Sequence, residues 1–143
     1  MADEIVVTAA LVGIVDPLKS TVKSYIASVA ITAGQAVYIV AATGKVALAS
    51  AAASNALSQF RGIALQSVGA GQAVDVLEDG ELYGFTLSAM AYGAPIFLND
   101  TAGALDIDTT QSTTNCIVGC VSCLTDKDLT KVARIVTPRY ISW

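Results

Sequence analysis

The 143-residue sequence contains no histidine, the side chain that most often serves as a general base near neutral pH. Nucleophilic systems that pair serine or cysteine with histidine are therefore excluded. Mechanisms based on a serine–lysine pair or on two carboxylates stay open from composition alone. Because the sequence contains no motif for such a site, we expect no enzymatic activity, no cofactor and no metal ion.

Charged residues are also scarce. They make up 14% of the sequence, against about 25% in a typical protein, while 54% of the residues are hydrophobic. The 8 lysines and arginines form no basic run that would neutralise phosphates, so nucleic acid is not expected as a partner. An uninterrupted apolar run of about 20 residues, which a membrane helix needs, is missing as well. We therefore expect a cytosolic product that buries its low-charge surface against other proteins. A monomer that exposes many alanines is the alternative.

Three cysteines form the pattern C-x3-C-x2-C at Cys116, Cys120 and Cys123, a spacing shared with an iron–sulfur loop of radical enzymes. In an extended segment the third thiol points away from the other two, which argues against a shared cluster. We expect buried, reduced cysteines, because an odd number in a chain of this size does not suggest a disulfide framework.

Clustered carboxylates have an ordinary explanation in the sequence pattern. Glu78, Asp79 and Glu81 flank Gly80, which predicts a turn with a solvated acidic tip. Asp106 belongs to an alternating segment whose leucine and isoleucine are expected to face the core, so its carboxylate is expected to face water. The glycines at 69–71 precede a predicted strand rather than a helix and lack a following Lys-Ser or Lys-Thr, which excludes a phosphate loop.

An internal repeat is the most informative feature that is present. The segment GQAVYIV, which begins at Gly34, matches GAPIFLN, which begins at Gly93, 59 residues later. The match continues through Gly44 and Gly103, and the offset becomes 57 where Gly62 meets Gly119.

Each repeat predicts a β-hairpin: a short strand, a four-residue turn that ends in glycine, and an alternating return strand. Short strands separated by glycine-bearing turns predict an all-β fold, a small β-barrel or sandwich built from two similar hairpin units. We divide the chain into an extended N-terminal arm at 1–32 and a β-domain at 33–143. The two units of this domain are expected at 33–90 and 91–137, followed by a short aromatic tail.

Both ends of the chain are apolar, and a free apolar end needs something to cover it. We expect one or both to dock on a neighbour by strand addition or by an aromatic anchor, although each could instead fold back on its own domain. Deleting residues 1–15 is then expected to leave the β-core folded and to weaken assembly. The candidate contact residues are Ile5, Val6, Val7, Leu11, Val12, Tyr140 and Trp143.

The motifs that begin at Gly34 (GQAVYI), Gly62 (GIAL), Gly69 (GAGQAVDV), Gly80 (GEL) and Gly93 (GAPIFLND) occur in an order that resembles the capsid decoration, or cement, proteins of tailed bacteriophages. The resemblance covers roughly residues 33–122 and rests on the order and spacing of the motifs. It implies a non-enzymatic virion protein, made in the bacterial cytoplasm, that binds the outer capsid surface and clamps neighbouring major capsid protein subunits.

The same resemblance implies self-association, with a homotrimer favoured and a dimer possible. Another all-β phage part, such as a tail, baseplate or head-fibre module, is the first alternative. A carbohydrate-binding module that uses Tyr83, Phe85, Tyr92 and Trp143 is the second, although most of these aromatic residues are expected in the core.

Overall fold

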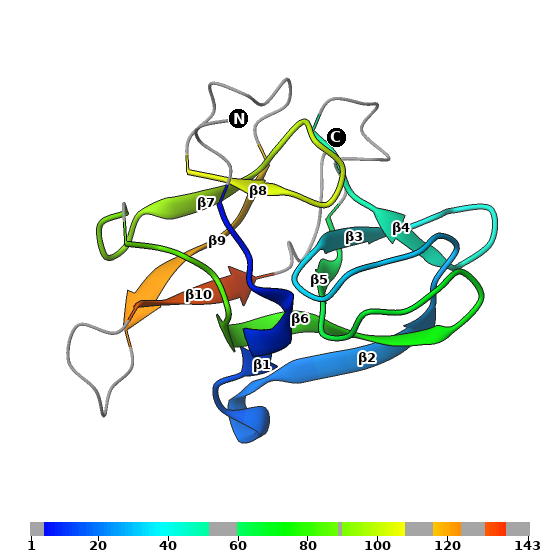
Figure 1. The fold of residues 1–143 in the computed structure, drawn as a ribbon, viewed down its shortest axis with the longest axis horizontal. Coiled ribbons are helices and arrows are strands. Elements are labelled where there is room, and N and C mark those ends of the chain that lie inside the picture. The colour runs from blue at the N-terminus through cyan, green and yellow to red at the C-terminus, as the bar shows by residue number, and fades with distance from the viewer. Residues whose placement is uncertain (1–4, 52–59, 89, 108–115, 124–130, 137–143) are drawn as a thin grey trace.

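A computed structural model describes residues 5–51, 60–88, 90–107, 116–123 and 131–136. Within these ranges the chain is almost entirely strand, and its helical parts are two single turns (Figure 1). The elements in chain order are η1 (Ala9–Leu11), β1 (Gly13–Ile14), η2 (Pro17–Lys19), β2 (Thr21–Ile26), β3 (Ala36–Ile39), β4 (Val46–Leu48), β5 (Gly62–Ala64), β6 (Ala73–Tyr83), β7 (Pro95–Leu98), β8 (Leu105–Asp106), β9 (Ile117–Cys123) and β10 (Lys131–Val136).

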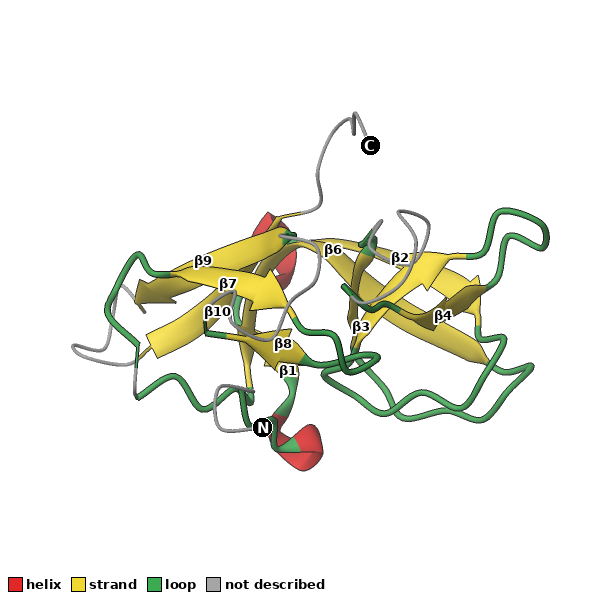
Figure 2. Cartoon of the chain, turned by 90° about the horizontal axis from the view of Figure 1, so that it is seen from above, coloured by secondary structure: helices red, strands yellow, loops and turns green. Residues whose placement is uncertain are grey.

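The described strands form one curled sheet in the order β4-β3-β5-β6-β10-β9-β7-β8, and all its ladders are antiparallel. The long strand β6 lies at its centre, with β5 and then β10 along one edge and β2 and then β1 along the other. Figure 2 shows β6 spanning two groups of strands, β2–β4 and β7–β10. The all-β fold class, a barrel-like sheet built from two similar hairpin units, is confirmed.

The two units have the same strand pairing. In the first hairpin Tyr38 lies opposite Ala47, and in the second the residues 59 positions later, Phe97 and Asp106, lie opposite each other. The main-chain bonds repeat as well. Gly34 N donates to Ala64 O at 2.8 Å, as Gly93 N donates to Val121 O at 2.8 Å. The sequence repeat is therefore a repeat of backbone structure.

Strand pairing places the start of the repeat earlier than residue 33. Val22 in β2 lies opposite Leu77, and the residues 59 and 57 positions later, Glu81 and Arg134, lie opposite each other. The first unit therefore runs from β2 into the first half of β6, and the second runs from the second half of β6 to β10. The expected turn at Glu78–Gly80 was wrong, because β6 continues through it. Gly80 has a φ of 145° and lets the strand pass close to a neighbouring side chain.

The expectation of an extended N-terminal arm over residues 1–32 was also wrong for its described part. Residues 21–26 form a strand of the first unit, and residues 13–14 pair with the end of β6. Ile5 is only 4% exposed and belongs to the main core. The apolar run at 5–15 is apolar because the segment packs against this chain.

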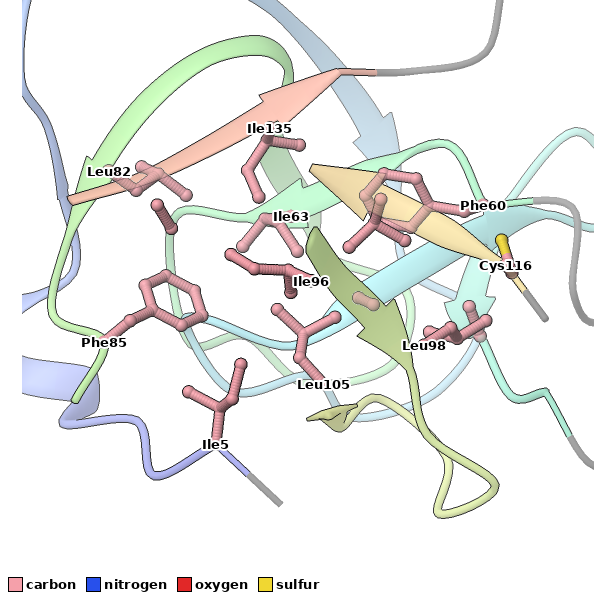
Figure 3. Packing of buried hydrophobic residues seen from close by; sticks show 14 of the residues in the cluster. Ile5, Phe60, Ile63, Leu82, Phe85, Ile96, Leu98, Leu105, Cys116 and Ile135 are labelled. Atoms are coloured by element: carbon pink, nitrogen blue, oxygen red, sulfur yellow. The ribbon is translucent and has the colours of Figure 1, made fainter. Parts of the chain in front are cut away.

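Two hydrophobic clusters stabilise the sheet. The smaller one, which includes Val37, Val46 and Val76, lies inside the first unit, where a bridge between Ala27 and Val46 brings the end of β2 to β4. The larger one joins the outer side of β3 and β5 to the second unit. Figure 3 shows its residues, which include Ile5, Phe60, Ile63, Leu82, Phe85, Ile96, Leu98, Leu105, Cys116 and Ile135.

Asp106 does not face water, as the alternating pattern had suggested. Its side chain is fully buried, and its Oδ2 accepts a hydrogen bond of 2.8 Å from Asn99 Nδ2. Asn99 is 1% exposed, and its Oδ1 accepts a second bond from Thr101 N at 2.7 Å. Strand β8 is covered on both faces, so the two-residue period does not separate an inner from an outer side.

We expect Asn99→Ala to lower the free energy of unfolding by about 2 kcal/mol, because it leaves a buried carboxylate without one of its donors. The first unit supplies a matched control, since the residues equivalent to Asn99 and Asp106 are Val40 and Ala47. The double variant Asn99→Val with Asp106→Ala copies this apolar pair and should recover most of the loss in urea unfolding. A double variant no more stable than Asn99→Ala would argue against the pairing.

Candidate interaction surface

The N-terminal segment occupies a gap in the second unit that has no counterpart in the first. In the first unit Val46 O accepts from Ser28 N at 2.8 Å, which joins β4 directly to the end of β2. The residue equivalent to Val46 is Leu105, and its carbonyl accepts instead from Ile5 N at 2.9 Å. On its other edge the segment pairs with residues 84–86 through a bridge between Val7 and Phe85.

The predicted contact residues divide into two groups around this insertion. Ile5 is buried, and Val7 and Val12 pack partly buried against the main core. Val6 and Leu11 are exposed at 64% and 65% and stay available to a partner. Tyr140 and Trp143 lie outside the described residues.

The most exposed large apolar side chain in the described residues is one that sequence reasoning missed. Leu18 is 97% exposed in the single turn η2. Asp16 caps this turn by accepting from Leu18 N at 3.0 Å, and Pro17 occupies its first position. Asp-Pro before an isolated leucine was the available signal, because it predicts a fixed turn that projects the side chain.

Exposed apolar side chains concentrate on the N-terminal part of the described chain. Residues 5–32 are 28 of the 108 described residues, yet they carry six of the ten large hydrophobic side chains that are exposed. We call these six the N-terminal apolar set: Val6, Leu11, Leu18, Val22, Ile26 and Val29.

A pocket of about 440 Å³ lies beside the inserted segment. Its walls come from residues 5–9, from residues 32–35 before β3 and from residues 101–104 in the turn between β7 and β8. Gln35 is the longest polar side chain among them, and no ionisable side chain lines the pocket. The pocket therefore offers apolar and main-chain contacts and no group for acid–base chemistry.

The carboxylates and thiols of the described residues are not brought together as a reactive centre. No group of three or more Cys, Asp or Glu side chains in the described ranges could hold a metal ion. Cys116 is buried, as expected, and burial raises the pKa of its thiol. The expectation of burial was wrong for Cys120, which is half-buried, and for Cys123, which is exposed; all three are free thiols.

A second pocket, of about 480 Å³, lies below η2. Asp16, Lys19, Glu81 and Arg134 line it together with Cys123. Glu81 and Arg134 face each other across the β6–β10 ladder. The pocket thus combines both signs of charge, which suits a polar rim beside Leu18.

Tyr25 is the ionisable group for which the structure indicates a pH effect. Burial, and then the hydrogen bond that Tyr25 donates to Glu78, raise its pKa to about 12. The unfolded chain loses this proton near pH 10. The stabilisation is therefore present below pH 10 and is lost as the pH rises from 10 to 12.

We expect the urea midpoint to fall between pH 10 and 12, and Tyr25→Phe to flatten this part of the profile. The phenylalanine keeps the ring over which the Lys23 ammonium lies at 5.3 Å. Parallel profiles for the two proteins would contradict the assignment to Tyr25.

Comparison of the sequence with models of protein families and with curated proteins finds no match. The described residues contain no helix of sufficient length and hydrophobicity to cross a membrane. Fold and surface thus define an all-β protein of two fused barrel-like units, with exposed apolar side chains gathered on one N-terminal segment.

Proposed function

We propose that the chain is a structural virion protein that binds the outer surface of a bacteriophage capsid and clamps neighbouring major capsid protein subunits. The family resemblance of residues 33–122 suggests the partner. The observation that carries the proposal is the N-terminal apolar set, because exposed apolar side chains in a low-charge protein favour a protein interface. In this proposal the chain is made in the bacterial cytoplasm and is not an enzyme.

Many weak contacts suit this function. Burial of one leucine side chain contributes about 2 kcal/mol, and repeated copies on a shell add avidity. The family resemblance favours association of the copies as a homotrimer over a dimer. Leu18 and Leu11 are the residues we propose as anchors, because they are the most exposed members of the N-terminal apolar set.

Co-sedimentation with capsids that lack the chain tests this proposal. We expect Leu18→Ser and Leu11→Ser each to weaken binding about tenfold, the equivalent of 1.4 kcal/mol. Tyr92→Ala is the matched control, because Tyr92 is 45% exposed but lies outside the N-terminal segment. Wild-type protein that stays in the supernatant, or that sediments with tails, would overturn the proposal. Glycan binding that Tyr92→Ala abolishes would favour the carbohydrate module.

A further inference from the structure

The outer edge of β2 is open where the second unit holds a paired strand. β2 pairs with β6 along one edge, and within the described ranges no strand pairs with its other edge between residues 21 and 25. Residues 21–24 are exposed on both faces of the strand. The bridge between Ala27 and Val46 closes the edge beyond this point.

The register identifies the free backbone groups. Ala27 N donates to Gln72 O at 2.9 Å, in line with the pairing of Tyr25 with Val74. In an antiparallel ladder, alternate residues direct both their N–H and their C=O to the partner strand. Tyr25 and Lys23 therefore bond to β6. The backbone groups of the alternate residues in the open stretch, 22 and 24, point to the open edge.

The second unit shows what such an edge accepts. Glu81 and Tyr83 are the equivalents of Val22 and Ser24, 59 residues later. Their outward edge holds β1: Val15 N donates to Glu81 O at 3.0 Å, and Gly13 lies opposite Tyr83. The same backbone geometry is thus paired in one unit and open in the other.

We propose that the edge of β2 at Val22 and Ser24 is a docking site for an extended segment of a partner protein, with an acidic residue opposite Lys23. Ile14 of β1 lies opposite Leu82, and the equivalent of Leu82 in the first unit is Lys23. Side chains at such a position lie close together, so an aspartate or glutamate there is favoured.

The open face beside Lys23 sets the rest of the partner's chemistry. Val22 and Ile26 are each 42% exposed on the opposite side of the strand, which favours small or β-branched residues on either side of the acidic one. A second copy that offers its own β2 in the antiparallel register would place two Lys23 side chains opposite each other, which is unfavourable. The site therefore fits a capsid segment better than another copy, and in this respect the inference rests on the proposed function.

A peptide experiment tests the site without any capsid. The probe is a heptapeptide with the sequence of residues 10–16 of this chain carrying Ile14→Asp, and the control peptide carries Ile14→Lys. We expect the aspartate peptide to shift the NMR amide signals of Val22 and Ser24 at least tenfold more strongly than the lysine peptide. Lys23→Glu should reverse the preference. Equal effects of both peptides, or shifts that avoid Val22 and Ser24, would overturn the site.

Hydrogen exchange on capsid-bound protein separates this inference from the proposed function. We expect the amides of Val22 and Ser24 to exchange at least tenfold more slowly on the capsid. Ser24→Pro should weaken capsid binding at least tenfold with an unchanged urea midpoint, because the Ser24 N–H does not bond to β6. Protein that binds with both amides still exposed would refute the β2 site and leave the proposed function standing. Protein that does not bind would refute the proposed function itself.

Discussion

Replacing Gly119 with alanine is expected to lower the free energy of unfolding by on the order of 4 kcal/mol, a loss typical of a disrupted core. A Cβ at Gly119 would lie 1.9 Å from the carbonyl oxygen of Arg134 in the adjacent strand. That oxygen belongs to the backbone of β10 and cannot rotate away as a side chain would. The two central strands of the second unit would have to separate.

The repeat provides a second position for the same experiment. Gly62, the equivalent of Gly119, would place a Cβ 2.3 Å from Leu77 O in β6. We expect Gly62→Ala to cost about 3 kcal/mol by the same overpacking. Gly13 is the matched control, because no heavy atom lies within 4 Å of a Cβ built there. Urea unfolding measures all three. A Gly119→Ala protein as stable as Gly13→Ala would contradict the close strand approach.

Deleting residues 1–8 is expected to destabilise the protein by about 5 kcal/mol. The deletion removes the buried Ile5 side chain, worth about 2 kcal/mol. It also removes three main-chain hydrogen bonds, each worth about 1 kcal/mol, from Ile5 N to Leu105 O, from Thr8 N to Gly84 O and from Thr86 N to Val6 O. The gap between β8 and residues 84–86 would then open to water.

The control for this deletion is a chain that lacks residues 1–4 and keeps Ile5. The two truncated proteins should differ by several kcal/mol in urea unfolding, and the shorter deletion sets the reference. Equal stability of the two would show that the inserted segment does not close the second unit, and would restore the earlier expectation of a detachable arm.

The repeat made most of the fold predictable from the sequence. Gly34 and Gly93 both have positive φ, at 92° and 81°, and their positions in the sequence mark the start of each hairpin. Gly62 and Gly119 mark the third strand of each unit, where the neighbouring backbone leaves no room for a Cβ. These glycines are visible in one sequence because the backbone conformation requires them twice.

The remaining features depend on partners that are far away in the sequence. The apolar segment at 5–15 looks like an adhesive arm unless it is known that the second unit has a gap between β8 and residues 84–86. Gly80 looks like a turn residue, although it serves a continuous strand. Asp106 follows an alternating pattern, yet both faces of β8 are covered. In each case a tertiary contact decides what the local pattern leaves open.

The candidate surface was predictable in part. Val6 and Leu11 are exposed as a contact residue should be, whereas Ile5 is a core residue. Leu18 was missed because an isolated leucine in a polar stretch carries no periodic signal. Its exposure results from the capped turn at Asp16 and Pro17, which only the structure shows.

Cryo-electron microscopy of the bacteriophage particle that carries this chain tests the central claim most directly. We predict density for the two fused units on the outer surface of the head, with Leu11, Leu18 and the edge of β2 facing the major capsid protein. Absence of this density from the shell would contradict the account. So would a bound chain whose N-terminal segment faces solvent.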